Sequence, residues 1–253
     1  MSAASSPNNV PPKPVQSASR RVPLPGWEAA VPRGEPSIGG FVPFSTVDWP
    51  GTLSAVVFIA GCPWRCGYCH NPHLQIRGGH YHWKSIVEFL RGRQGLLDGV
   101  VFSGGEPLSE PLLPQMIRTA RSLGLRVALH TAGIYPSRLQ DVLPCLDWVG
   151  MDIKADAAGY DLLTGRNGSH AATQACLDIL LRGQAIFECR TTWSPQWLSE
   201  PALLALARHL SARGVRHYAV QNHRGAPGAA PSAVLSLTTQ NTLRLLFDSF
   251  AYR

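Results

Sequence analysis

The sequence contains no long apolar run and no segment typical of an export signal. Its 253 residues include no stretch of about eighteen apolar side chains, the length that a membrane-spanning helix needs. The first residues, Met-Ser-Ala-Ala-Ser-Ser-Pro, have neither the basic start nor the apolar core of a secretory signal. We therefore expect a protein without membrane segments that works in the reducing cytoplasm.

Acidic residues are few, and the basic residues do not cluster. The chain has 23 Lys and Arg against 16 Asp and Glu, which gives a formal net charge of +7. This balance permits nucleic-acid binding, but the arginines are scattered and no run of basic or alternating basic and aromatic residues occurs. The charge therefore favours a solvated basic surface over direct contact with nucleic acid. A further use consistent with it is the docking of an acidic electron donor.

The sequence also lacks the cysteine spacing of a disulfide framework. It has 6 cysteines, of which Cys145, Cys176 and Cys189 lie far apart on predicted core elements. We expect these three to be buried free thiols. None of these three has another cysteine close to it in the sequence.

The remaining cysteines, Cys62, Cys66 and Cys69, form a C-x3-C-x2-C group directly after the apolar run 53–60. A four-iron cluster needs four ligand positions, and so does a closed zinc site. Three thiolates on one loop leave one position open, as catalytic metal sites do. The spacing indicates an iron–sulfur cluster with one iron free to bind a ligand.

Two alternatives use the same residues. Cys66-Gly-Tyr-Cys69-His70 has the C-x-x-C-H spacing of covalent haem attachment, which normally follows export, and no export signal is seen. A structural zinc site could be completed by His70 or His73. The zinc alternative stays open at this point.

Proline and hydrophobic periodicity divide the chain into two parts. Residues 1–36 are rich in Pro and Ser and predict a loosely packed leader, while 37–253 predict one domain. Strands are predicted at 53–60, 98–103, 125–130, 146–153, 186–192 and 215–221. Helices are predicted at 83–93, 110–122, 136–143, 170–182, 199–213 and 238–250, the last one capped by Thr238 and Thr239.

Alternating strands and helices predict an α/β fold with a parallel sheet, closed only in part, as a partial (β/α)6 TIM-like barrel. In such sheets functional groups collect where the strands end. The cysteine loop, Ser103-Gly-Gly-Glu-Pro107, His130-Thr131 and Asp152-Ile-Lys154 end four successive predicted strands. Arg190 lies on the fifth and His223 follows the sixth, as weaker candidates.

The residues at two of these strand ends are candidates to bind an amino-acid ligand. Gly104 and Gly105 would let a ligand approach the backbone closely, and Glu106 would add a carboxylate at the mouth of the barrel that suits a cationic amino group. Asp152 and Lys154 flank Ile153 on a strand, so both point to one face and could bind a zwitterion or a cation. An ordinary turn and a surface ion pair are the plain alternatives.

Together these motifs resemble the radical S-adenosylmethionine superfamily. The cysteine triad carries an aromatic residue before its last cysteine, and Gly-Gly-Glu-Pro follows the next strand. The stretch 40–51 and His70-Asn-Pro72 resemble the activases of glycyl radical enzymes, in particular those of anaerobic ribonucleotide reductases. The resemblance covers about residues 38–223.

The resemblance implies a four-iron four-sulfur cluster held by the three cysteines, with S-adenosylmethionine bound to the open iron. Tyr68 would back the adenine or the cluster, and Gly104, Gly105 and Glu106 would hold the methionyl ammonium. The other cofactor-binding candidates are His130, Thr131, Asp152, Lys154, Arg190 and His223. Family members often carry Asp where this chain has His130, and a histidine binds alkali metals poorly, which argues against a cation site there.

The function implied is reductive cleavage of S-adenosylmethionine and formation of a glycyl radical on a partner enzyme, most consistent with an anaerobic (class III) ribonucleotide reductase. A flavodoxin or ferredoxin would supply the electron. Two other functions stay open: a radical enzyme acting on a small molecule such as a deazapurine precursor, and a zinc-binding scaffold without redox chemistry.

Overall fold

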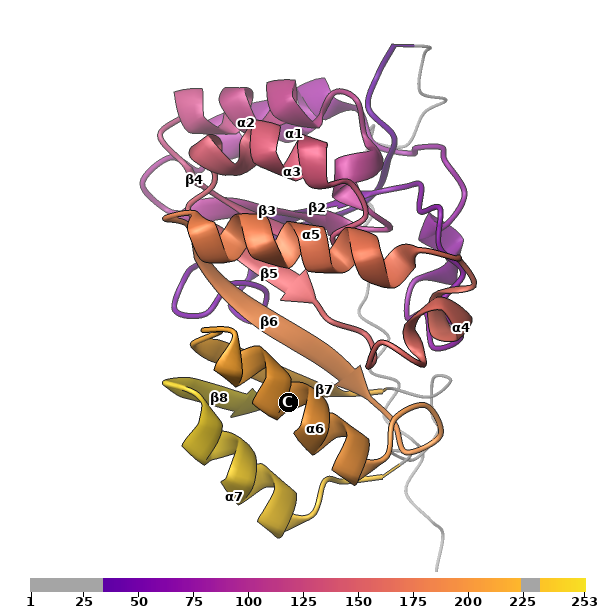
Figure 1. The fold of residues 1–253 in the computed structure, drawn as a ribbon. Coiled ribbons are helices and arrows are strands. Elements are labelled where there is room, and N and C mark those ends of the chain that lie inside the picture. Colours follow the sequence, from indigo (N-terminus) through magenta and orange to yellow (C-terminus); the bar gives the residue numbers. More distant parts are fainter. Residues whose placement is uncertain (1–33, 224–232) are drawn as a thin grey trace, which may run out of the picture.

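The structure is a computed structural model that describes residues 34–223 and 233–253. Its strands form one sheet in which spatial order follows chain order (Figure 1). They are β1 (Ile38–Ser45), β2 (Ser54–Ile59), β3 (Gly99–Gly104), β4 (Arg126–Thr131), β5 (Trp148–Asp152), β6 (Ile186–Trp193), β7 (His217–Asn222) and β8 (Ser249–Tyr252). The pairs from β2 to β8 are parallel, and β1 is antiparallel to β2.

Helices connect the parallel strands. They are α1 (Trp83–Arg91), α2 (Leu113–Ser122), α3 (Pro136–Val142), α4 (Tyr160–Thr164), α5 (Ser169–Arg182), α6 (Glu200–Ala212) and α7 (Leu237–Leu246), with the 3-10 turns η1 (Pro72–Leu74), η2 (Pro107–Ser109) and η3 (Leu143–Cys145). The predicted partial parallel barrel is confirmed, because each of the six predicted strands is present with a helix after it.

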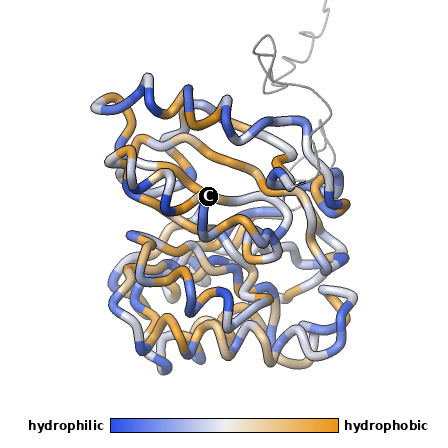
Figure 2. The backbone as a smooth tube through the Cα atoms, turned by 90° about the horizontal axis from the view of Figure 1, so that it is seen from above, coloured by the Kyte–Doolittle hydropathy of each residue, from blue (hydrophilic) through white to orange (hydrophobic). Residues whose placement is uncertain are grey.

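The main core lies between the sheet and these helices. Strand residues such as Val57, Phe102 and Leu129 pack against buried helix residues such as Ile86 and Leu177. Figure 2 shows the resulting pattern, with alternating hydrophobic and hydrophilic stretches along the helices. We call this side of the sheet the helix-covered face and the opposite side the inner face.

The inner face is apolar where the strands begin. Trp49, from the turn between β1 and β2, stacks on Trp148 with ring centroids 6.3 Å apart and joins Val56, Val101 and Ala128 in a separate buried cluster. The turn therefore packs against the inner face, and the indole ring of Trp49 covers the end where the strands begin.

Three local predictions need correction. The edge strands β1 and β8 were not predicted, and the helix expected over 238–250 ends at Leu246, because Ser249–Tyr252 pairs with β7. Ser236 caps that helix, its Oγ accepting from the amide of Thr239 at 3.2 Å, so Thr238 is not the cap. Sequence periodicity cannot tell whether residues 249–252 form a helix end or a strand, because a segment as short as Ser-Phe-Ala-Tyr suits both.

Other expectations have mixed outcomes. Cys176 and Cys189 are buried and free as predicted, whereas Cys145 is free but only half-buried, at the end of η3. Of the predicted leader only residues 34–36 are described, so its state lies outside the described residues. In the part of the chain that the structure describes, no helix is long and apolar enough to cross a membrane.

Candidate active site

The cysteine loop follows β2 and is fixed to the carboxyl end of η1 by backbone hydrogen bonds. The amide of Gly61 donates to the carbonyl of Leu74 at 2.8 Å, and that of Cys62 donates to Gln75 at 3.1 Å. On its other side the loop bonds to α4. Figure 1 shows α4 on the side to which the arrowheads of β5 and β6 point, where the parallel strands end.

The three thiols of the loop are free and half-buried. Burial raises the pKa of Cys62 to about 11 and also raises that of Cys66, an effect that the charge of Lys154 partly offsets. Metal ligation requires thiolates, so iron binding would release these protons.

The donor set suits a cluster better than a single ion. Among the described residues no three Cys, His, Asp or Glu side chains lie close enough to hold one metal ion. The compact Cys3His arrangement that a zinc site needs is therefore not formed by them. In a four-iron cluster each thiolate binds a different iron, which allows wider spacing of the sulfurs.

Tyr68, between Cys66 and Cys69, presents a buried hydroxyl that lacks a protein partner. The residue is 5% exposed, and its Oη has no hydrogen-bond partner among the described residues. The Nζ of Lys154 lies 5.8 Å from the centre of the ring, and the ring of His223 lies 6.1 Å away. A buried polar atom without a partner is costly, so it fits a site completed by a bound ligand.

Gly104 and Gly105 are needed for a different reason than predicted. A Cβ on Gly104, whose φ is +119°, would lie 2.4 Å from the carbonyl oxygen of Ile59, and one on Gly105 would lie 2.6 Å from that of Leu74. Protein backbone, rather than a ligand, occupies this space. The glycines therefore let the β3 loop pack against the cysteine loop, and their role toward a cofactor stays a prediction.

Glu106 was predicted to lie at the mouth of the barrel, but it is fully buried. Its Oε1 accepts from the Leu108 amide at 3.0 Å and from Thr131 Oγ1 at 2.7 Å, and its Oε2 accepts from the Ala132 amide at 2.9 Å. Burial raises the pKa of Glu106 to about 7 despite these bonds. Glu106 and Thr131 thus join the loops after β3 and β4, and contact with a cofactor is a prediction for both.

Asp152, Lys154 and Arg190 form a charged group on the inner face, as the alternation around the fully buried Ile153 predicts. Arg190 donates from Nη2 to Asp152 Oδ1 at 2.8 Å, and Lys154 Nζ lies 3.4 Å from Asp152 Oδ2. Burial would raise the pKa of Asp152, but the two cations outweigh it and lower the pKa to about 2. The pKa of Lys154 lies well above its usual value, because nearby acidic groups outweigh the effect of burial.

The arginine fits over Gly150. A Cβ on Gly150 would lie 2.8 Å from Cζ of Arg190. The group carries two cations for one carboxylate, so it retains one positive charge that can attract the carboxylate of a ligand.

His130 does not offer a free nitrogen to a ligand. One ring nitrogen, Nε2, lies 2.7 Å from the carbonyl oxygen of Asp48, and Nδ1 lies 3.2 Å from Oγ of Ser103. Burial and the charge of Arg190 hold the pKa of His130 well below its usual value, so the ring is neutral. Nε2 then donates to Asp48 and Nδ1 accepts from Ser103. Direct contact of His130 with a cofactor stays a prediction, and these bonds do not support it.

His223 lies close to the cysteine loop. Its ring stacks on that of His70 with centroids 5.2 Å apart, and its amide donates to the carbonyl of Trp193 at 2.8 Å. The structure thus brings the cysteines, Tyr68, Lys154 and His223 together, while Glu106 and His130 lie in buried bonding networks beside them.

Sequence reasoning missed Asp48 and Tyr160 as neighbours of this site, and it placed Ser103 at the end of a strand without predicting its bond to His130. Ser103 lies two residues beyond Val101 on one face of the strand, so its orientation could have been predicted. Asp48 acts through its backbone, and Tyr160 lies in a helix of only five residues, so neither gives a residue-type signal.

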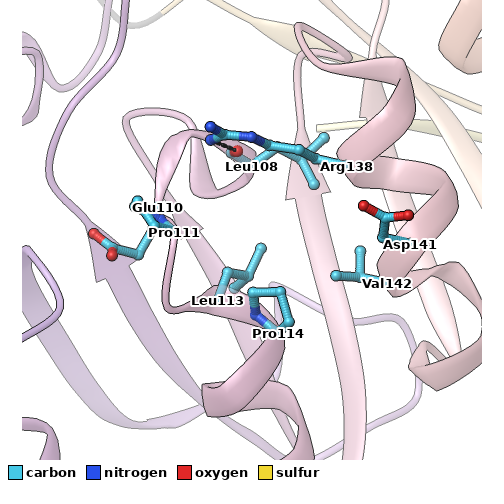
Figure 3. A pocket seen from close by; sticks show the side chains of 8 residues that line it. All are labelled: Leu108, Glu110, Pro111, Leu113, Pro114, Arg138, Asp141 and Val142. Atoms are coloured by element: carbon cyan, nitrogen blue, oxygen red, sulfur yellow. Dashed lines mark hydrogen bonds between the residues drawn. The ribbon is translucent and has the colours of Figure 1, made fainter.

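A separate hollow of about 270 Å³ lies on the helix-covered side, between η2 and the ends of α2 and α3 (Figure 3). Arg138 lies at its rim and donates to the carbonyl of Leu108 at 2.8 Å. The other lining residues are Glu110, Pro111, Leu113, Pro114, Asp141 and Val142. None of the cysteines contributes to it, so this hollow is distinct from the candidate active site.

Comparison with known proteins identifies the family of this chain. The family model described as the Radical SAM superfamily matches residues 56–184, just over half of the chain. A protein of Methanocaldococcus jannaschii, provisionally named as a glycyl-radical enzyme activating enzyme, is 28% identical over 68% of this chain and 74% of its own length. The pyruvate formate-lyase-activating enzyme of Clostridium pasteurianum is 35% identical, but the match covers 47% of this chain and 53% of that enzyme.

Solved structures show the same fold. SuiB of Streptococcus suis, bound to the precursor peptide SuiA, superposes with a TM-score of 0.59 over 78% of this chain and 48% of that one, at 13% identity. This fold has three free thiols on one loop, and beside them a buried Tyr68 hydroxyl that lacks a hydrogen-bond partner among the described residues, so the residues present fit the cofactors of the matched family. The chain therefore belongs to the radical SAM superfamily, whose members use a four-iron four-sulfur cluster and S-adenosylmethionine.

Proposed function

We propose that this enzyme activates a glycyl radical enzyme, by removing a hydrogen atom from a glycine of that protein. The observation that supports it most is the placement of Cys62, Cys66 and Cys69 beside Tyr68, Lys154 and Asp152 at the ends of the parallel strands. The names of the two matched sequence relatives favour this branch of the superfamily.

The cysteine loop would hold the cluster, and the charged group would hold the amino-acid end of S-adenosylmethionine. When bound, these two cofactors supply a carbon-centred radical that abstracts hydrogen. Lys154 and Arg190 would attract the methionyl carboxylate, and Asp152 would keep both cations oriented. The unpartnered Tyr68 hydroxyl would bond to a polar atom of the cofactor, while its ring keeps water from the loop.

The partner that we propose is an anaerobic ribonucleotide reductase. The support is the resemblance of the stretch 40–51 to the activases of those enzymes. That stretch includes the turn with Asp48 and Trp49, which folds beneath the inner face.

The test is electron paramagnetic resonance of a reaction that contains the oxygen-free enzyme, iron, sulfide, S-adenosylmethionine, a chemical reductant and a purified anaerobic ribonucleotide reductase. We expect the doublet of a glycyl radical, and its absence in a mixture made with Cys66→Ala. Cleavage of S-adenosylmethionine without the doublet would reject this partner. Cleavage that instead depends on an added small molecule would identify a small-molecule enzyme.

We further propose a flavodoxin or ferredoxin as the electron donor. The formal net charge of +7 suits an acidic donor protein. The rate of cluster reduction by such a donor should fall as salt rises, because screening weakens attraction between exposed charges. A rate indifferent to ionic strength would contradict charge-guided docking.

A further inference from the structure

We propose that α4 is a positioning element that holds the cysteine loop at a fixed place relative to the end of β5, and that Tyr160 joins the two. The proposal depends on membership of the radical SAM superfamily and not on the identity of the partner protein. The helix α4 and Tyr160 lie outside the motifs that the sequence analysis identified.

The first contact is between α4 and the backbone of the cysteine loop. The amide of Arg65 donates to the carbonyl of Thr164 at 2.8 Å, and the amide of Gly67 donates to that of Leu163 at 3.0 Å. The last carbonyls of a helix have no partner within it, so the loop satisfies them. The two segments are thus joined by main-chain bonds on both sides of Cys66.

The second contact is between aromatic side chains. Trp64, on the cysteine loop, is 2% exposed and packs edge-on against Tyr160 with ring centroids 6.0 Å apart and an interplanar angle of 79°. This geometry is favourable for an aromatic pair and adds to the burial of both rings. The indole ring thereby anchors the loop on the first residue of α4.

The third contact runs from Tyr160 to the end of β5. Its fully buried hydroxyl donates to the carbonyl of Asp152 and accepts from the amide of Lys154, each at 3.4 Å. Burial raises the pKa of Tyr160 to about 12, so the hydroxyl keeps its proton and can donate. One side chain therefore touches both the cysteine loop and the backbone of the residue pair proposed to bind the cofactor.

The helix itself is held firmly despite its length. Asp161 accepts from the amide of Gly168 at 2.8 Å and from Ser169 Oγ at 2.7 Å, and Thr164 Oγ1 lies 2.7 Å from Ser169 Oγ. A helix of five residues is not stable alone, so these bonds fix it on the start of α5.

The cysteine loop and the end of β5 would have to act together in binding the cluster and the cofactor. The cluster and the cofactor's amino-acid group have to meet with a small tolerance, and a displacement of about 1 Å is enough to impair such chemistry. The contacts of Tyr160 with Trp64, Asp152 and Lys154 would limit changes in that distance. Weakening it should lower cofactor affinity while leaving cluster content intact.

The main test is Tyr160→Phe, which removes one oxygen atom and keeps the ring against Trp64. We expect unchanged iron content, an affinity for S-adenosylmethionine about 5-fold weaker, and a smaller change in the spectrum of the reduced cluster when the cofactor is added. The matched control is Tyr218→Phe, which removes a fully buried hydroxyl bonded to Thr191 Oγ1 on the helix-covered face. Iron content, cofactor affinity and the spectral change can all be measured without turnover and without a partner protein.

A second variant tests the loop side of the connection. Trp64→Leu removes the ring that contacts Tyr160 but stays apolar, and we expect chelators to strip iron from it several-fold faster than from the parent. If Tyr160→Phe behaves like Tyr218→Phe in both affinity and spectrum, or if Trp64→Leu loses iron at the parental rate, the proposal is wrong. These outcomes are independent of whether a glycyl radical forms.

Discussion

The two ends of the inner face are built from the same strands but carry different side chains, which are apolar where the strands begin and polar where they end. Where the strands begin, Val101 and Ala128 lie with Trp49 and Trp148 in an apolar cluster. Further along, the strands carry polar groups instead: Ser103 Oγ lies 3.2 Å from Nδ1 of His130, and Asp152 accepts from Arg190 at 2.8 Å. The comparison teaches that one face of a parallel sheet can hold part of the fold's core at one end and the polar groups of a candidate active site at the other.

This division separates two kinds of consequence. Changes at the end where the strands begin should mainly alter stability, because Trp49 and Trp148 are buried there in an apolar cluster. Changes where the strands end should alter ligand binding and its pH dependence. Variants at each end can test whether effects on stability and effects on ligand binding are separated in this way.

The largest effect is expected from Cys66→Ala. A half-buried thiol contributes little to packing, so the free energy of unfolding should change by about 1 kcal/mol or less, while cluster retention and cleavage of S-adenosylmethionine are lost together. Iron analysis and product chromatography measure the two losses. Cleavage at the parental rate would show that these cysteines do not hold the cluster.

Next in size is Trp49→Ala, at the apolar end. The indole is 4% exposed and lies against Trp148 and, at 4.9 Å, the guanidinium of Arg126. Its removal should lower the free energy of unfolding by about 3–5 kcal/mol, as measured by chemical denaturation. A loss below about 1 kcal/mol would mean that this turn does not close the face.

Asp152→Asn tests the polar end. It leaves the cations of Arg190 and Lys154 without their carboxylate, so we expect a loss of about 1–3 kcal/mol, reduced because the Asp152 side chain is 32% exposed, and weaker cofactor binding. Because its folded pKa of about 2 lies below the usual 3.8, the stability that Asp152 contributes is complete above pH 3.8 and is lost as pH falls toward 2. The variant should lack that part of the acid dependence, and an identical acid profile would contradict the ion pair.

Glu106 should show the opposite pH dependence. Its folded pKa of about 7 lies above the usual 4.5, so its contribution to stability is greatest below pH 4.5 and declines as pH rises to 7. Glu106→Gln should remove this slope and should itself cost about 1–3 kcal/mol, because its amide group would face a donor. Denaturation curves at several pH values measure both. Persistence of the slope in the variant would assign it to another group.

The smallest effect is expected from Ser103→Ala. The acceptor Nδ1 of His130 loses one neutral hydrogen bond, which should cost about 1 kcal/mol and leave the ring neutral. The pKa of His130, measured by nuclear magnetic resonance, should remain below its usual value. A rise to the usual value would show that the hydroxyl, and not burial, keeps the ring uncharged.

The sequence predicted the six core strands and the cysteine loop, because apolar alternation and the spacing of like residues are local signals. It also placed Asp152 and Lys154 on one face correctly. It could not show that Glu106 is buried or that His130 is bonded at both nitrogens, since both facts depend on Thr131, Ala132 and Asp48 arriving from other strands and turns.

The missed elements have a similar explanation. β1 contains Gly39, Gly40 and Pro43, which weaken any strand signal, and it is stabilised by pairing with β2. α4 is too short to give a helical period, and its stability comes from Asp161 and Ser169. In each case tertiary contacts decide the structure.

The close packing of Arg190 over Gly150 has a consequence for sequence variation among homologues. A Cβ at position 150 would lie 2.8 Å from Cζ of Arg190 and 2.8 Å from the ring of Trp148, so these side chains would have to shift, and the hydrogen bond of Arg190 to Asp152 opposes movement of the guanidinium. Position 150 is therefore expected to vary together with positions 148 and 190. Homologues that keep both Trp148 and Arg190 should keep the glycine, and a larger residue at position 150 should accompany a change in one of those two side chains.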